Sequence, residues 1–308
     1  MSGPPNAKLK LLVFGGGYLG RAAALEAMRR GGTAVATSRD PARRMALEAE
    51  GIAAVDPTDR EALSGALAEA TTVLITAPPD AQGCPALRAL AVAESVSTAW
   101  PDWIGYVSST AVYGDRNGGW AFEGDALNAS SLEGGRRVRA EADWLDAGRG
   151  MGLTVQIFRL PAIYGPGRSV VDRLRDGSAR LVRKPGQVFN RVHVEDAVAG
   201  LFASMAKPRP GAAYNLADDE PCGQNDVIAY AARLLGLDPP PFVALDALSA
   251  PARAFYAENR RVANGKAKRV LGWRPLYPDY RLGLRALSAM TSPIPASTAP
   301  DAASSDQR

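Results

Sequence analysis

Residues 11–24 read LLVFGGGYLGRAAA, in which an apolar run of strand length passes through a Gly-x-Gly-x-x-Gly turn into an alanine-rich helix. In such a turn Gly15 permits the tight bend, Gly17 lets backbone N–H groups approach a phosphate, and Gly20 lets the helix pack closely on the strand. The helix dipole then favours an anion at this end. The stretch therefore predicts a cradle for the pyrophosphate of a dinucleotide, with a turn that binds no ligand as the alternative.

The rest of the first 160 residues alternates between apolar runs of strand length and helical stretches. Strands are predicted at 8–14, 33–37, 51–55, 72–76, 103–108 and 153–158, and helices at 18–30, 41–50, 59–69, 84–99 and 135–148. Strands that are joined by helices pair in parallel. The chain is therefore predicted to have an α/β fold, a Rossmann-type doubly wound parallel sheet with a smaller C-terminal substrate lobe.

Beyond residue 160 the alternation loosens into loops rich in Pro and Gly. Helices are expected at 169–175, at 194–206, from about 223 and at 279–290, with a further strand at 212–216. We expect residues 1–160 to form an NADP-binding Rossmann domain, to which some later segments return, and 161–291 to form the smaller lobe. Residues 292–308 are rich in Pro, Ser, Ala and Asp and are expected to be a disordered tail.

The composition is ordinary for a soluble globular protein, with 46% hydrophobic residues, 22% charged residues and a net charge of +4. No apolar run reaches the roughly 18 residues that cross a bilayer, and no signal peptide is evident. The arginines are scattered among acids rather than concentrated for nucleic acid. Cys84 and Cys222 lack metal-ligand spacing, which favours reduced thiols. These features predict a cytoplasmic protein with a small-molecule substrate and without a metal, membrane or nucleic-acid partner.

The end of the second predicted strand indicates which dinucleotide binds. NAD-selective sites place Asp or Glu there, about 20 residues beyond the glycine turn, to bond the ribose 2′-hydroxyl. This chain has Ser38 and Arg39, which suit the additional 2′-phosphate of NADP. The alternative is that Arg39 only begins the following helix with Asp40 and Pro41. Asp56, after the third strand, is placed either to contact the adenine amino group or to cap the next helix.

Three further motifs follow the glycine turn, namely VSSTAVYG at 107–114, FRLPAIYGPG at 158–167 and VHVEDA at 192–197. Together they resemble the extended short-chain dehydrogenase/reductase superfamily, in particular the NAD-dependent epimerase/dehydratase family, over about residues 10–290. The first glycine of that family's turn is Phe14 here, which leaves the general spacing intact. The resemblance implies an oxidoreductase with a nicotinamide coenzyme, and a homodimer through two helices is common in such relatives.

The resemblance assigns Ser109 as the residue whose hydroxyl binds the reacting oxygen of the substrate, with Ser108 or Thr110 able to substitute. The carboxyl end of a parallel strand is where open α/β sheets bind ligands, which supports this assignment independently. The alternative is that the three hydroxyl groups end the strand by bonding the local backbone. Tyr164 and Arg168 are expected to join Ser109 and Thr110 around the substrate.

The family's acid/base pair, Tyr-x-x-x-Lys followed four residues later by Glu, is absent. Matching that Glu to Glu141 places Arg137 at the Lys position and Glu133 at the Tyr position. Arg137 could keep the positive field and the ribose contact, but its high pKa excludes proton transfer. Glu133 would need a raised pKa in a closed, apolar site to supply the proton. An exposed helix start is its alternative role.

This absence resembles the atypical members of the superfamily. Tyr113 and Tyr164 are candidate replacement acids, and packing of their rings under the loops is the alternative. The resemblance places Arg159 at the substrate mouth, and it gives His193 a structural role at the start of a helix. The residues expected to bind the cofactor are Gly15, Gly17, Tyr18, Leu19, Gly20, Ser38, Arg39, Asp56, Thr76, Ala77, Pro78 and Arg137.

Three functions are compatible with these residues. The first is an NADP(H)-dependent oxidoreductase that passes hydride between C4 of the nicotinamide and a carbonyl or alcohol carbon near Ser109. The second is an NADP(H)-binding sensor or scaffold protein without turnover, which the missing Tyr/Lys pair would allow. The third is an epimerase of a nucleotide sugar, which the resemblance favours and the missing tyrosine opposes.

Overall fold

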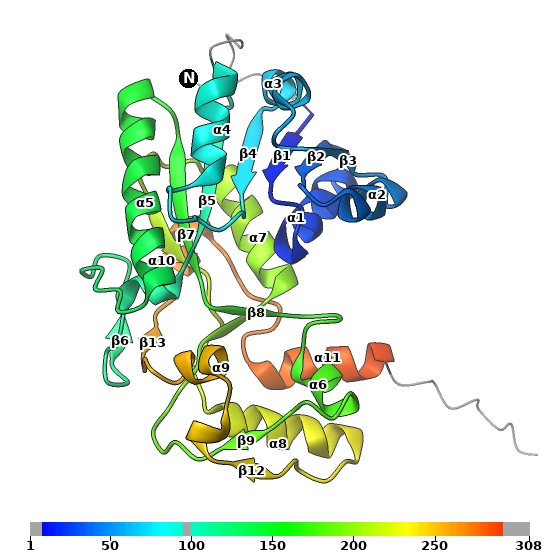
Figure 1. The fold of residues 1–308 in the computed structure, drawn as a ribbon, viewed down its shortest axis with the longest axis vertical. Coiled ribbons are helices and arrows are strands. Elements are labelled where there is room, and N and C mark those ends of the chain that lie inside the picture. Colours follow the sequence, from blue (N-terminus) through cyan, green and yellow to red (C-terminus); the bar gives the residue numbers. More distant parts are fainter. Residues whose placement is uncertain (1–7, 95–99, 292–308) are drawn as a thin grey trace, which may run out of the picture.

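The computed structural model describes residues 8–94 and 100–291, which form an α/β molecule with a central parallel sheet (Figure 1). The sheet has the strand order β11-β7-β5-β4-β1-β2-β3. Its strands are β1 (Lys10–Phe14), β2 (Thr33–Thr37), β3 (Ala53–Val55), β4 (Thr72–Ile75), β5 (Trp103–Ser109), β7 (Val155–Leu160) and β11 (Ala213–Asn215). The direction of winding reverses between β1 and β4, at the switch point where doubly wound sheets bind ligands. The predicted Rossmann-type fold is confirmed.

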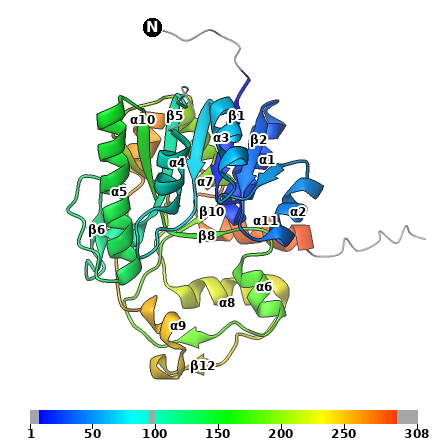
Figure 2. The same ribbon diagram turned by 45° about the horizontal axis from the view of Figure 1, so that its top comes forward.

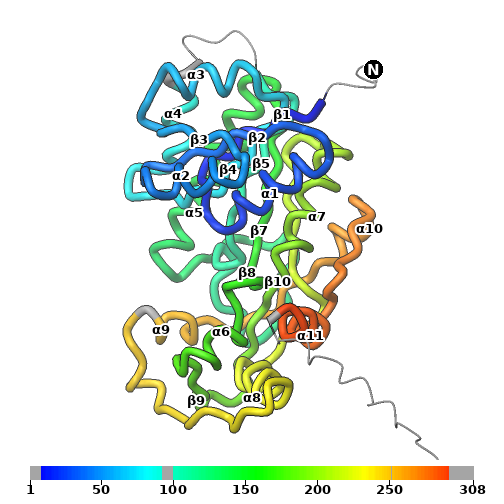
Figure 3. The backbone as a smooth tube through the Cα atoms, turned by 90° about the vertical axis from the view of Figure 1, so that its right-hand side faces the viewer, coloured from blue at the N-terminus to red at the C-terminus, as the bar shows by residue number. Residues whose placement is uncertain are grey.

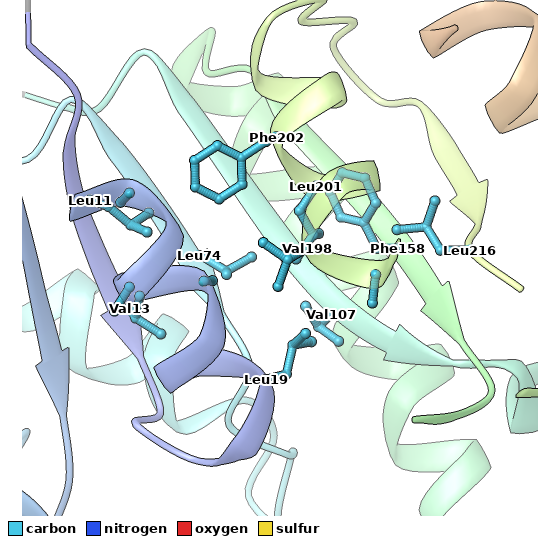
Figure 4. Close-up of a cluster of buried hydrophobic side chains, with 14 of the residues drawn as sticks. Leu11, Val13, Leu19, Leu74, Val107, Phe158, Val198, Leu201, Phe202 and Leu216 are labelled. Carbon is cyan, nitrogen blue, oxygen red and sulfur yellow. The ribbon is translucent and has the colours of Figure 1, made fainter. Parts of the chain in front are cut away.

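Helices cover both faces of the sheet, which explains why β4 and β7 are buried along their whole length. One face carries α1 (Tyr18–Arg29), α7 (Val194–Met205) and α10 (Gly265–Leu271), and the other carries α3 (Arg60–Glu69), α4 (Pro85–Glu94) and α5 (Leu132–Met151). Figure 4 shows part of the first core, in which Val13 and Phe158 of the strands lie near Leu19 of α1 and Val198 of α7. The remaining helix of this half, α2 (Pro41–Ala49), lies beside β3.

The predicted strands and helices have counterparts in the structure. The helix predicted at 84–99 is α4, and its last five residues lie outside the described residues. Helix α5 begins three residues earlier than expected because Ser131 Oγ accepts a hydrogen bond from the N–H of Gly134 at 3.1 Å and caps the helix. The strand expected at 212–216 is β11, which adds a seventh strand to the predicted six.

A smaller lobe lies beyond the carboxyl ends of the sheet strands (Figures 1 and 3). Its apolar core joins α6 (Val170–Arg175), α8 (Gln224–Leu235) and α11 (Tyr280–Thr291). The strands β8 (Ala162–Tyr164) and β10 (Arg191–His193) pair in parallel and lie between the sheet and this lobe (Figure 2). The other short elements are β6 (Trp120–Ala121), β9 (Leu181–Val182), β12 (Phe242–Val243), β13 (Arg261–Val262), α9 (Ala250–Ala254) and two 3₁₀ turns, η1 (Thr110–Tyr113) and η2 (Leu245–Ala247).

The chain crosses between the sheet and the lobe more than once. After β8 and α6 it returns to the sheet with α7, goes on to β11 at the sheet edge, and then forms α8 in the lobe. The division into domains at residue 160 therefore stays a proposal. Some segments after residue 160, among them α7 and β11, belong to the Rossmann-type half. The tail expected at 292–308 lies outside the described residues. Within residues 8–94 and 100–291, no helix combines the length and hydropathy that a membrane span requires.

Candidate functional site

The glycine turn between β1 and α1 has the shape of a phosphate cradle. Gly15 has φ +113°, a conformation that side-chain-bearing residues rarely adopt. A Cβ atom added to Gly20 would lie 2.1 Å from the carbonyl oxygen of Gly15, so only glycine lets α1 approach the turn this closely. A Cβ added to Gly17 would meet nothing within 4 Å, which leaves open space in front of the first turn of the helix.

The backbone donors of this turn divide into two groups. The N–H of Gly15 donates to Thr37 Oγ1 at 3.0 Å, and the N–H of Gly16 donates to the Thr37 carbonyl oxygen at 2.7 Å. Gly17 is the N-cap of α1 and has no side chain to cap the helix, so the N–H groups of Tyr18 and Leu19 have no acceptor among the described residues. These orphan donors at the positive end of a helix fit the pyrophosphate of a dinucleotide.

The residues at the end of β2 present a free cation. Ser38 Oγ accepts a hydrogen bond from the N–H of Asp40 at 3.2 Å, and the Asp40 carboxylate caps α2 by accepting from the N–H of Ala42 at 3.0 Å. Arg39 precedes this cap and is exposed, and its guanidinium bonds no other described residue. Because Asp40 caps α2 and Pro41 is its first residue, the structure also fits the alternative in which Arg39 only leads into this helix, and coenzyme binding by Arg39 stays a prediction.

Asp56 anchors the loop that follows β3. Its Oδ1 accepts hydrogen bonds from the N–H of Thr58 at 2.9 Å and from Thr58 Oγ1 at 2.7 Å, and its Oδ2 accepts from Arg44 Nη1 at 2.9 Å. The backbone N–H of Thr58 is the main cause of the lowered pKa of Asp56. The suggestion that Asp56 caps the next helix is wrong, because Asp59 caps α3 through the N–H of Ala62. Contact with adenine stays a prediction.

The segment after β4 borders the glycine turn, as expected for cofactor-binding positions. Thr76 Oγ1 donates a hydrogen bond to the carbonyl oxygen of Gly15 at 2.6 Å. The N–H of Ala77 donates to the carbonyl oxygen of Phe14 at 3.0 Å, and Pro78 follows directly. These contacts place the end of β4 against the turn, on the side opposite to β2.

Ser109 ends β5 and is the least buried of the three neighbouring hydroxyl residues. Its Oγ accepts a hydrogen bond from the N–H of Ala111 at 3.2 Å and so caps η1. The hydroxyl thus bonds the local backbone as an acceptor, and its own proton has no described acceptor. Ser108 and Thr110 are buried, at 3% and 5% exposure, so Ser109 is the one best placed to reach a ligand.

The two α5 residues that the sequence match assigned to the family's Lys and Tyr positions, Arg137 and Glu133, differ in environment. Arg137 is half-buried, and its Nη1 donates to the carbonyl oxygen of Val107 at 3.0 Å, which holds a positive charge against β5 two residues before Ser109. Glu133 lies exposed in the first turn of α5. That position lacks the closed, apolar surroundings that a carboxyl proton donor needs, and it matches the alternative role of Glu133 at an exposed helix start.

Tyr113 is part of a buried polar network rather than of an open site. Its hydroxyl donates to Asn215 Oδ1 at 2.7 Å and accepts from Arg159 Nη1 at 3.0 Å, while burial raises its pKa. Arg159 in turn pairs with Glu141 at 2.7 Å, and the side chains are 7% and 3% exposed. The expectation that Arg159 frames the substrate mouth is wrong, since its guanidinium is enclosed, and the position of Tyr113 favours packing over proton donation.

Tyr164 and Arg168, which were expected at the substrate, have different surroundings: Tyr164 packs on His193, and Arg168 lies over Tyr18. The Tyr164 ring packs edge-on against His193 at 5.2 Å between centroids, and its hydroxyl lies against Gly283 of α11, with no described hydrogen-bond partner. Burial raises its pKa. The exposed Arg168 lies over the ring of Tyr18, 5.4 Å from its centroid, and is therefore beside the start of α1.

His193 has the structural role that the sequence predicts. Its Nδ1 accepts a hydrogen bond from the N–H of Glu195 at 3.4 Å, which caps α7. Its ring is 1% exposed and lies 4.1 Å from the ring of Tyr277 between centroids. Burial lowers its pKa to about 4, so it is neutral at physiological pH.

Sequence reasoning missed Thr37, whose side chain and carbonyl both hold the glycine turn. The available signal is a hydroxyl residue at the carboxyl end of the apolar strand TAVAT, next to the strand that carries the glycines. It also missed the partners of Arg159 and Tyr113, which lie 18 and 102 residues away in the sequence. No cluster of three or more His, Cys, Asp or Glu that could hold a metal occurs among the described residues.

Comparison with known proteins matches residues 11–217 to the model of the NAD dependent epimerase/dehydratase family. Protein YeeZ of Escherichia coli strain K12 is 30% identical over 175 residues, which are 56% of this chain and 58% of YeeZ. A 3-diazoavenalumate denitrifying reductase of Streptomyces is 30% identical over 161 residues, 48% of this chain and 51% of that protein. The chain thus spans little more than half the length of these curated relatives.

Solved structures match along nearly the whole chain. A conserved protein of unknown function from Silicibacter pomeroyi is 44% identical, with a TM-score of 0.84 over 91% of this chain and 98% of its own. UDP-glucuronic acid 4-epimerase from Bacillus cereus, solved in complex with NAD, has a TM-score of 0.74 at 17% identity, covering 91% of this chain and 96% of its own. At that identity the second likeness shows the fold alone.

Proposed function

Because the chain belongs to the NAD-dependent epimerase/dehydratase family, we propose that it is an NADP(H)-dependent oxidoreductase of the atypical type acting on a carbonyl or alcohol group. The observation that carries this proposal is the open start of α1, where the N–H groups of Tyr18 and Leu19 lack acceptors beside the clear space at Gly17. The coenzyme, when bound, supplies the hydride chemistry. A small-molecule substrate and a cytoplasmic location belong to the same proposal.

The residues of this chain would divide the work as follows. The N–H groups at the start of α1 bind the pyrophosphate, and Arg137 provides a positive charge near the ribose and the end of β5. Ser109 would donate its hydroxyl proton as a hydrogen bond to the reacting oxygen, since its Oγ already accepts from the local backbone. Stabilising charge on that oxygen lowers the barrier of a hydride transfer.

The preference for NADP is a proposal that rests on Ser38 and Arg39. Two of the solved relatives, a UDP-glucuronic acid 4-epimerase and a dTDP-glucose 4,6-dehydratase, were solved in complex with NAD. In this chain a free guanidinium and a hydroxyl occupy the end of β2, where an NAD site places a carboxylate. A guanidinium binds a phosphate through charge-assisted hydrogen bonds, so these two residues support the phosphorylated coenzyme.

A calorimetric titration with NADPH and NADH tests this preference. Because one charge-assisted contact contributes about 1.5–3 kcal/mol, NADPH should bind about tenfold to a hundredfold more tightly. Arg39→Ala should remove the difference by weakening NADPH alone, whereas Arg60→Ala, an exposed arginine of α3, should leave it unchanged. Equal affinities of the wild-type protein for NADPH and NADH would remove the role given to Arg39.

A sensor or scaffold without turnover is the second candidate, because a specific observation favours it. Glu133, which the sequence match assigns to the position of the family's tyrosine, is exposed, and Tyr113 is enclosed in a polar network. Neither of these side chains is placed as a proton donor beside Ser109. A protein that binds the coenzyme and changes its affinity for a partner protein would need no such group.

Turnover assays with NADPH and a panel of carbonyl compounds and nucleotide sugars separate the two candidates. For an enzyme, Ser109→Ala should lower turnover about a hundredfold or more, because it removes the hydrogen bond to the reacting oxygen, and NADPH affinity should stay the same. Ser108→Ala is the matched control, since its hydroxyl is buried without a partner. NADPH binding without turnover of any compound, together with a coenzyme-dependent change in partner affinity, would favour the sensor.

A further inference from the structure

Two threonines hold the glycine turn from the strands on either side of β1. In the sheet, Val13 pairs with Ala36 of β2, and Phe14 pairs with Ile75 of β4. Thr37 is the last residue of β2 and Thr76 directly follows β4, so the register brings both beside Gly15. Each threonine stands at the carboxyl end of its strand, which is the edge where the proposed coenzyme binds.

The two hydroxyl groups use both polar groups of one glycine. Thr37 Oγ1 accepts a hydrogen bond from the N–H of Gly15 at 3.0 Å, and Thr76 Oγ1 donates to the carbonyl oxygen of Gly15 at 2.6 Å. Thr37 is 1% exposed, and its carbonyl oxygen also accepts from the N–H of Gly16 at 2.7 Å. Gly15 and Gly16 are therefore fixed from within the protein, and their N–H groups are not free for a phosphate.

This arrangement controls a backbone segment that is otherwise free to rotate. Gly15 has φ +113° and no side chain, so it has many accessible conformations, and fixing one of them costs conformational entropy. The orientation of its peptide groups sets where the chain enters α1, and hence where the N–H groups of Tyr18 and Leu19 point. A pre-organised cradle binds more tightly because this ordering precedes binding.

We infer that Thr37 and Thr76 are positioning residues for the dinucleotide, which clamp Gly15 so that the first turn of α1 presents its free N–H groups to the phosphates. This inference rests on the proposed function. It adds Thr37 to the site, and it gives Thr76, already expected among the cofactor-binding residues, a role through its hydrogen bond to Gly15. A Cβ added to Gly20 would lie 3.1 Å from Thr76 Oγ1, so the same hydroxyl also limits the space at the other end of the turn.

Calorimetry of NADPH binding to Thr37→Val, Thr37→Ser, Thr76→Val and Thr76→Ser tests the inference. Valine keeps the branched shape and removes the hydroxyl, so each valine variant should bind about tenfold more weakly, as expected for one unmade hydrogen bond of about 1.4 kcal/mol. Serine keeps the hydroxyl and should restore most of the affinity. Rescue by serine separates the hydrogen bond from packing of the threonine methyl group.

Thr33→Val of β2 and Thr72→Val of β4 are the matched controls, because they lie at the opposite ends of the same strands. Both should bind NADPH like the wild type. If the wild-type protein binds NADPH and both Thr37→Val and Thr76→Val bind it with the same affinity, the inference is overturned while the proposed function stands. The same holds if the valine variants bind more weakly but the serine variants do not restore the affinity. Absence of NADPH and NADH binding by the wild-type protein overturns both.

Amide hydrogen exchange of the wild-type protein gives a second measurement that needs no variant to fold. Without coenzyme, the amides of Gly15 and Gly16 should exchange slowly because they are bonded to Thr37, and those of Tyr18 and Leu19 should exchange fast. Adding NADPH should slow the second pair only. Fast exchange at Gly15 in the free protein would show that the clamp is not formed, and would overturn the inference.

Discussion

His193 shows how burial alone changes the chemistry of a residue. Its pKa is lowered to about 4 from an ordinary value of 6.5 because the ring is removed from water. Between these two pH values the unfolded chain binds a proton that the folded protein does not. The free energy of unfolding should therefore fall as the pH decreases from 6.5 to about 4, by up to about 3 kcal/mol.

Urea unfolding of the wild-type protein and of His193→Asn across this pH range tests the effect. Asparagine can still accept the N–H of Glu195 as an N-cap, but it does not titrate. The stability difference between the two proteins should change steadily between pH 6.5 and 4 and be constant above pH 7. A difference that does not depend on pH would show that the pKa of His193 is the same in the folded and unfolded protein, and that burial does not lower it.

The comparison of the wild type with His193→Asn is needed because Asp218 changes the free energy of unfolding with pH in the opposite direction. Burial raises the pKa of Asp218 well above its ordinary value, and neither carboxylate oxygen has a hydrogen-bond partner among the described residues. Its contribution to stability is greatest at low pH and is lost as the pH rises through its folded-state pKa. The wild-type profile contains both trends, and the difference between wild type and His193→Asn isolates one.

Single residues also mark where sequence reasoning reaches its limit. The family resemblance was enough to single out Ser109 and Arg137, and the structure has Arg137 bonded to the carbonyl oxygen of Val107, two residues before Ser109. The burial of Tyr113 could not be predicted, because its partner Asn215 is 102 residues away and meets it only when β11 joins the sheet. A tyrosine in a loop after a strand is open to solvent or enclosed depending on such a distant partner.

At the scale of elements, the start of α1 offers a sharp test of the cradle. Gly17→Ala introduces a Cβ with no atom within 4 Å and at φ −76°, which alanine adopts readily, so the fold should be unchanged. The methyl group would occupy the path of the phosphates, and NADPH affinity should fall about tenfold or more, as for a lost charge-assisted hydrogen bond. Urea unfolding and calorimetry on the same samples measure both quantities.

Gly20→Ala is the contrasting variant on the same helix. Its Cβ would lie 2.1 Å from the carbonyl oxygen of Gly15 and 2.9 Å from Val13 Cγ1, so α1 must shift away from β1. Overpacking of this kind destabilises a protein by about 1–3 kcal/mol.

The outcome for Gly17→Ala decides the role of the cradle. If this variant binds NADPH like the wild type, the phosphates do not approach along this path.

The start of a helix was predictable where a capping residue directly precedes it in the sequence. Asp40 directly precedes the helix predicted from residue 41, and its carboxylate caps α2. For α3 the cap was assigned to the wrong residue, because Asp59, placed inside the predicted helix, does the capping that was suggested for Asp56. The start of α5 was predicted late because its first residues, Leu132 and Glu133, are followed by two glycines that weaken the helical pattern. The hydroxyl of Ser131 decides the start instead.

At the scale of the whole molecule, periodicity was enough to predict a parallel sheet, because strands buried on both faces read as uninterrupted apolar runs. It was not enough to predict which later segments rejoin that sheet. Strand β11 has three residues, and its pairing with β7 depends on the burial of Tyr214 against Phe158, whose rings stack at 6.1 Å between centroids. A contact between segments this far apart in the sequence cannot be predicted from the periodicity of apolar residues.

The route of the chain has a consequence for its synthesis. Because α7 and β11 complete the sheet only after β8 and α6 have been made, a nascent chain that ends near residue 160 has β7 as an open edge and one apolar face without α7. Open strand edges pair readily with other chains. The ribosome must therefore deliver about two thirds of this polypeptide before its first half is protected from aggregation, and chaperones that shield emerging chains would act in that interval.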